Sequence, residues 1–143
     1  KLFEDGVVTF DSTEKIWSFK VGSLFAFILG GLYLISALVT LFLIKEKFNI
    51  FGFIYNPSNR KFLLIFDAPF LLISIAAIIE EMHWFIFIIF FMHALNSMTL
   101  LMRPQLFYQS KEEMHLMDES ALNNYLVIMT SVIGIGCLLV SYF

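Results

Sequence analysis

Residues 21–44 read VGSLFAFILGGLYLISALVTLFLI and contain no charged side chain. The hydrocarbon core of a bilayer is about 30 Å thick, and about 20 apolar residues in a helix are enough to cross it. The strands of a membrane barrel would instead alternate between polar and apolar residues over about 10 positions. The run therefore predicts a membrane-spanning helix.

Three more runs have the same character. Residues 62–79 contain one charged residue, Asp67, and residues 84–102 and 121–143 contain none. The chain of 143 residues is 59% hydrophobic and 15% charged, whereas a soluble domain is about 25% charged. The sequence thus predicts an all-α integral membrane protein. Its single domain would be a four-transmembrane-helix bundle over residues 21–143, preceded by a short extramembrane segment over residues 1–20.

The connections between the runs are short. Residues 48–55 are mainly apolar but too few to cross a bilayer, which predicts that they lie at the membrane interface. Ser110 and Glu113 form the Ser-x-x-Glu pattern of a helix start. This pattern predicts a helix that begins near Ser110 and continues into the fourth span.

The basic residues predict an orientation. Six of the nine Lys and Arg residues lie in the loops 45–61 and 103–120, and the other three lie in residues 1–20. Short cytoplasmic loops carry an excess of Lys and Arg. We therefore expect these two loops on the cytoplasmic side, or its equivalent in an organelle, and both termini on the opposite side.

Asp67 is the most informative side chain in the four runs. An ionisable residue inside a span is costly, and by default it suggests a functional site. Depth counted from the helix ends places Asn96 and Ser97 closest to it, followed by Thr40, with His93 about one turn deeper. These residues are the candidate polar cluster. It would be either a hydrogen-bonded packing network or a site that conducts protons or binds a small polar ligand.

The face of the second span follows from its helical phase. Asp67 and Ser74 are seven residues apart, almost two full turns, and so share a side that we expect to face the interior. Ile65, Leu72 and Ile79 have the same spacing and predict a lipid-facing side.

His93 allows a different function. An intramembrane histidine could ligate haem or a magnesium pigment, but His83 and His115 lie outside the spans and offer no second axial ligand. A packed, hydrogen-bonded histidine is the simpler interpretation, and no cofactor is expected.

The tetrapeptide Glu-Glu-Met-His occurs twice, at residues 80–83 and 112–115. Its Glu-x-x-His spacing resembles half of the di-iron site of ferritin-like bundles. Because residues 84–102 should place the two copies on opposite membrane faces, no shared metal site is expected.

Small residues mark two candidate helix-packing faces. Gly22, Ala26 and Gly30 recur every four residues, the spacing that lets membrane helices approach closely. Thr130 and Gly134 form a similar stripe on the fourth run.

Nothing in the chain resembles a nucleophile with its base, a phosphate-binding loop or a basic tract for nucleic acid. We therefore expect no catalysis, and a small accessory or structural subunit of a larger membrane complex. Its partners would be the lipid bilayer and other membrane subunits, with no nucleic acid. Two alternatives stay open: a small transporter or proton-conducting subunit built around Asp67, and a haem- or pigment-binding electron-transfer subunit that uses His93.

Overall fold

The chain forms helices throughout the part that the structure, a computed structural model, describes: residues 24–114 and 116–142. The long helices are α2 (Leu24–Lys45), α4 (Arg60–Glu80), α5 (Trp84–Met102) and α7 (Glu119–Tyr142). All four are long and apolar enough to cross a membrane. The predicted all-α class is confirmed, and the four predicted runs coincide with these helices to within a few residues. The predicted segment 1–20 lies outside the described residues.

Short elements join the long helices. The sequence from α2 to α4 contains α3 (Ile50–Ile54) and the 3-10 turn η1 (Pro57–Asn59), and α6 (Pro104–Met114) lies between α5 and α7. The side chain of Asn49 accepts a hydrogen bond from the backbone N–H of Gly52, and Asn56 does the same for Ser58. These caps satisfy donors that a helix start leaves without a partner.

The predicted helix start at Ser110 is wrong. Ser110 lies inside α6, which begins at Pro104, and its hydroxyl donates to the carbonyl of Phe107. Proline suits the first position of a helix because its missing N–H would have no partner there. After Met114 the helix does not continue into α7, because residues 116–118 form a turn.

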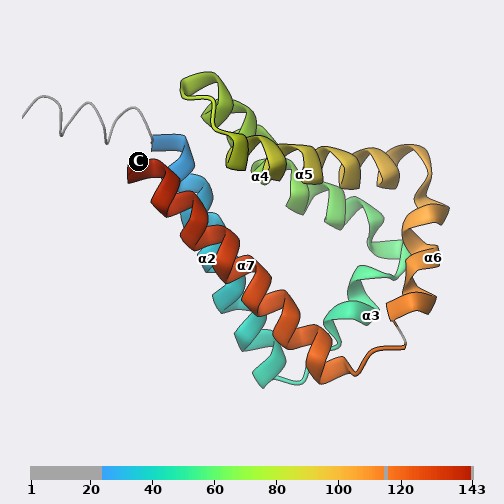
Figure 1. Cartoon of the computed structure of the whole chain (residues 1–143). Helices are drawn as coiled ribbons and strands as arrows, with labels where there is room; N and C mark the ends of the chain where they lie inside the picture. The colour runs from blue at the N-terminus through green and yellow to red at the C-terminus, as the bar shows by residue number, and fades with distance from the viewer. Residues whose placement is uncertain (1–23, 115, 143) are drawn as a thin grey trace, which may run out of the picture.

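The long helices are arranged as two pairs. Helix α2 lies beside α7, and α4 lies beside α5 (Figure 1). The pairs converge where α2 begins and α7 ends, and they diverge towards α3 and α6 (Figure 1). At the converging end, a carboxylate oxygen of Glu80 accepts a hydrogen bond of 3.1 Å from the backbone N–H of Phe25. The result is a wedge whose wide end contains the two short helices.

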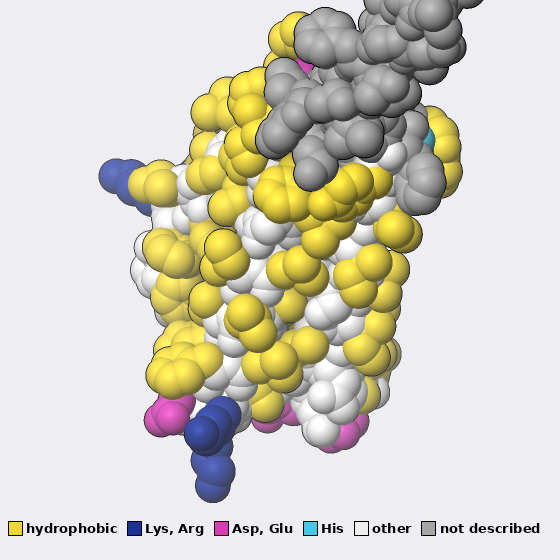
Figure 2. All heavy atoms as spheres, turned by 90° about the vertical axis from the view of Figure 1, so that its left-hand side faces the viewer, with side chains coloured by type: hydrophobic (Ala, Val, Ile, Leu, Met, Phe, Trp, Pro, Cys, Tyr) yellow, Lys and Arg dark blue, Asp and Glu magenta, His cyan; other side chains and the backbone are white. Residues whose placement is uncertain are grey.

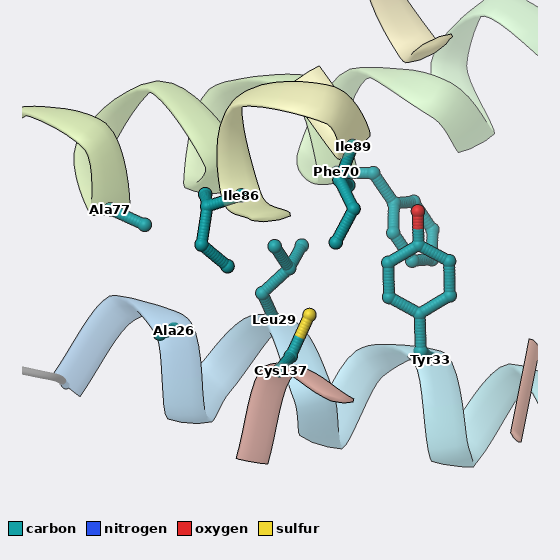
Figure 3. Close-up of a cluster of buried hydrophobic side chains, with 8 residues drawn as sticks. All are labelled: Ala26, Leu29, Tyr33, Phe70, Ala77, Ile86, Ile89 and Cys137. Atoms are coloured by element: carbon teal, nitrogen blue, oxygen red, sulfur yellow. The ribbon is translucent and has the colours of Figure 1, made fainter. Parts of the chain in front are cut away.

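The core occupies the converging part of the wedge. Its buried residues come from all four long helices: Ala26, Leu29, Tyr33, Phe70, Ala77, Ile86, Ile89 and Cys137. Leu29 and Cys137 lie at its centre, whereas Tyr33 and Phe70 lie together at one edge (Figure 3). The core is therefore the point at which the two pairs are held together.

Helices α2 and α7 cross at two glycines. A Cβ atom built on Gly30 would lie 2.9 Å from the carbonyl oxygen of Gly134, and one on Gly134 would lie 3.0 Å from the side chain of Leu34. Ala26, one turn earlier, is also buried. Ala26, Gly30 and Gly134 thus lie in packed positions between α2 and α7 or within the core. Thr130 instead bonds to carbonyls of its own helix, and Gly22 lies outside the described residues.

Helix α4 has the two faces that its phase predicts. Asp67 and Ser74 are buried, with 6% and 0% of their surface exposed, whereas Ile65, Leu72 and Ile79 are 72%, 65% and 80% exposed. The inward face of α4 therefore places the carboxylate of Asp67 against the neighbouring helices.

Candidate functional site

Asp67 binds two side chains of α5 through its two carboxylate oxygens. The hydroxyl of Ser97 donates to Oδ2 at 2.5 Å, and Oδ1 is hydrogen-bonded to Nδ1 of His93. Because His93 and Ser97 are four residues apart, they lie on one face of α5 and reach the same carboxylate. The intramembrane acid predicted from the sequence thus has a polar partner for each of its oxygens.

His93 extends this network to a third helix. Its second ring nitrogen, Nε2, is hydrogen-bonded to the hydroxyl of Tyr33 on α2. The imidazole also stacks on Phe70, with ring centroids 5.2 Å apart and an interplanar angle of 15°, and Tyr33 meets the edge of Phe70 at 4.9 Å. We call Asp67, His93, Ser97 and Tyr33 the Asp67 cluster. It ties α2, α4 and α5 together beside the apolar core.

The structure brings together some of the predicted cluster and not the rest. Ser97, a first choice, contacts Asp67 directly, and so does His93, which was expected to be a longer reach. Thr40 instead donates to the carbonyl of Ser36 on its own helix, and the two carboxylate oxygens of Asp67 are bonded to His93 and Ser97 and not to half-buried Asn96. Tyr33 was not predicted. It occurs in an apolar run, where a tyrosine gives no signal beyond its need for a hydroxyl partner when buried.

The contacts of His93 bear on the haem alternative. A neutral imidazole binds a metal through a free ring nitrogen, and both nitrogens of His93 are already hydrogen-bonded. A haem or pigment at this position would have to displace Tyr33 or Asp67.

The two Glu-x-x-His copies lie at opposite ends of α5. Glu80 and His83 precede α5, and the side chain of His83 caps its first turn by accepting from the backbone N–H of Phe85. Glu112 lies in α6, beyond the other end of α5, and His115 lies outside the described residues. Within residues 24–114 and 116–142, no three His, Cys, Asp or Glu side chains are grouped so as to hold a metal.

Arg60 makes a contact that the sequence did not predict. From the first turn of α4 its Nε donates to the carbonyl of Leu100 at 2.7 Å, and its Nη2 donates to that of Leu101 at 2.9 Å. The last carbonyls of a helix have no partner within it. The guanidinium fork therefore caps α5 and attaches its end to α4.

In the Asp67 cluster a carboxylate, an imidazole and a hydroxyl are hydrogen-bonded in that order. Enzymes with a nucleophilic hydroxyl use the same order, in which the carboxylate orients the imidazole and the imidazole acts as the base for the hydroxyl. The hydroxyl of the cluster, however, belongs to a tyrosine that is 5% exposed and packed against Phe70. The arrangement can accept, hold or release a proton, but Tyr33 has no surface to offer a substrate.

In the comparisons with known proteins, no family model, curated protein or solved structure matches this chain.

Proposed function

We propose that the protein is inserted in a membrane with α2, α4, α5 and α7 as its four spans. The exposed surface of these helices supports this proposal, since many large apolar side chains on them are more than 50% exposed. Figure 2 shows hydrophobic side chains over most of the face in view, with charged side chains at its edges. In water so large an apolar surface would be unfavourable, whereas lipid solvates it.

The sidedness follows the basic residues. Loops 45–61 and 103–120 are proposed to be cytoplasmic, or equivalent, with both termini on the opposite side. Lys45 and Lys111 in the last turns of α2 and α6 belong to this basic side.

Within the membrane, we propose that the protein acts as a non-catalytic accessory subunit of a larger assembly. One observation carries this proposal: hydroxyl side chains on all four spans are hydrogen-bonded within the protein itself, whereas the buried amide oxygen of Asn123 on α7 has no partner among the described residues. Outside the Asp67 cluster, hydroxyls bond to carbonyls three or four residues earlier on the same helix; these are the hydroxyls of Ser36, Thr40, Ser74, Thr99, Thr130 and Ser141. Side chains bound in this way are not free to orient or activate a substrate.

Extraction of the native membrane in a mild detergent tests this proposal. We expect the chain to migrate with other membrane subunits in fixed stoichiometry, and chemical cross-links to join exposed positions of its spans to those subunits. A chain that migrates alone, and whose cross-links are confined to itself, would contradict an accessory role.

A further inference from the structure

We propose that Asp67 and His93 form a proton-binding site within the span, which opens towards the α3–α6 end of the molecule and is closed at the other end. This inference goes beyond the accessory role, because it gives the subunit a ligand of its own.

The hydrogen bond between Asp67 and His93 defines two charge states of the pair. With one proton, carried on Nδ1 of a neutral imidazole, the carboxylate leaves the pair with a net charge of −1. A second proton makes the pair neutral, either as imidazolium with carboxylate or as imidazole with carboxylic acid. A net charge is costly inside a membrane, and proton uptake removes it without breaking the contact between the two side chains.

Tyr33 can accommodate both states. In the one-proton state Nε2 of His93 is a bare acceptor, and the tyrosine hydroxyl donates to it. In the two-proton state Nε2 carries a hydrogen and donates to the tyrosine oxygen, so the direction of this hydrogen bond reverses. Proton binding is thereby communicated to α2, since Tyr33 lies on that helix.

Polar groups lead from the pair towards the wide end of the wedge. Ser97 contacts Asp67, and three residues further along α5 the carbonyl of Leu100 accepts from Arg60. Arg60 is seven residues from Asp67 on α4, which is about 10 Å along the helix. These groups mark the side from which a proton would reach the carboxylate.

The other side of the pair is apolar. Beyond Tyr33 and Phe70 lie the side chains of Leu29, Ile86 and Cys137, and then Ala26 and Ala77 (Figure 3). Tyr33 on α2 and Cys137 on α7 are the titratable side chains within this layer, and Glu80 at the end of α4 lies beyond it, where it accepts from the backbone N–H of Phe25. An apolar layer of this kind does not relay protons, which favours a closed site over the conducting pathway that the sequence left open.

Nuclear magnetic resonance of the protein in lipid nanodiscs tests the site. With labelled histidine and aspartate, the imidazole nitrogens of His93 and the carboxyl carbon of Asp67 are followed from about pH 3 to pH 9, a range that brackets the usual pKa values of the two side-chain types. We expect both signals to change in a single coupled transition. The matched control, His83→Gln, removes one histidine from the spectrum and leaves this transition unchanged.

Two variants decide the assignment. Asp67→Asn preserves the shape of the side chain but cannot ionise, so the coupled transition should be lost. Tyr33→Phe preserves the ring and the pair but removes the hydroxyl partner of Nε2, so the coupled transition should persist at a shifted pH, and it provides a second readout if Asp67→Asn does not fold. If neither signal of the native protein changes with pH, or His93 titrates identically in Asp67→Asn, the site does not exist.

Liposomes that contain a pH indicator and a potassium diffusion potential test the closed end. We expect the protein to give no proton flux above that of protein-free liposomes. A flux that disappears in Asp67→Asn would show that the site is open on both sides and would overturn this part of the proposal.

Discussion

Arg60 connects α4 to the end of α5 through two hydrogen bonds from one guanidinium group. Lysine keeps the charge but cannot make both bonds in this fork geometry. We predict that Arg60→Lys lowers the free energy of unfolding by about 1.5–3 kcal/mol, the range for hydrogen bonds that involve a charged group. Thermal denaturation in detergent measures this loss.

The neighbouring lysine supplies the control for Arg60. Lys61 is exposed on the same turn of α4, and Lys61→Gln should leave the stability within about 0.5 kcal/mol of the parent. Equal losses in both variants would show that net charge, and not the contact with α5, accounts for the effect.

At this scale the sequence predicted the inward direction of Asp67 and its contact with Ser97, because helical phase and depth suffice for two adjacent antiparallel helices. The same counting paired Asp67 with Thr40 on α2 and missed Tyr33. Counting depth along each helix assumes that α2 stays at a constant distance from α4. Since the two pairs diverge (Figure 1), the last turns of α2 lie away from α4, and a residue two turns earlier makes the contact.

At the scale of helices, the crossing of α2 and α7 depends on a missing side chain. A Cβ at Gly30 would lie 2.9 Å from a backbone oxygen of α7, whereas a Cβ at Gly31 has nothing within 4 Å. We predict that Gly30→Ala destabilises the protein by about 1–3 kcal/mol, as overpacking does. Gly31→Ala should leave stability unchanged or raise it by up to about 1 kcal/mol, because alanine favours a helix.

Melting temperatures of the two alanine variants in detergent test this prediction. Both substitutions change the intrinsic helix propensity equally, so the difference between them isolates the contact with α7. If the two variants melt together, the close approach of Gly30 to Gly134 does not hold the helices.

The spacing of Ala26 and Gly30 indicated this packing face, because close approach requires small residues at regular intervals. The spacing of Ser110 and Glu113, by contrast, predicted a helix start in the wrong place. Ser-x-x-Glu is a local pattern that also occurs inside helices, and here Pro104 begins the helix six residues earlier. Local patterns therefore identified helix faces better than helix ends.

For the whole molecule, the four proposed spans would place residues 58 and 116 on one side of the membrane and residue 82 on the other. We predict that an impermeant thiol reagent labels Ser58→Cys and Leu116→Cys from the same side and Met82→Cys from the opposite side. All three positions are exposed. The parent protein is the control, because its single cysteine, Cys137, is fully buried. Labelling of positions 58 and 116 from opposite sides would contradict four spans.

The divergence of the helix pairs has a consequence for the surrounding lipid. Seated in a bilayer, the molecule would occupy a larger cross-sectional area in the leaflet that holds α3 and α6 than in the leaflet where the pairs converge (Figure 1). Unequal areas of this kind bend a membrane, with the more crowded leaflet on the convex side. The protein would therefore accumulate where the membrane already curves in that direction, and several copies side by side would promote such curvature.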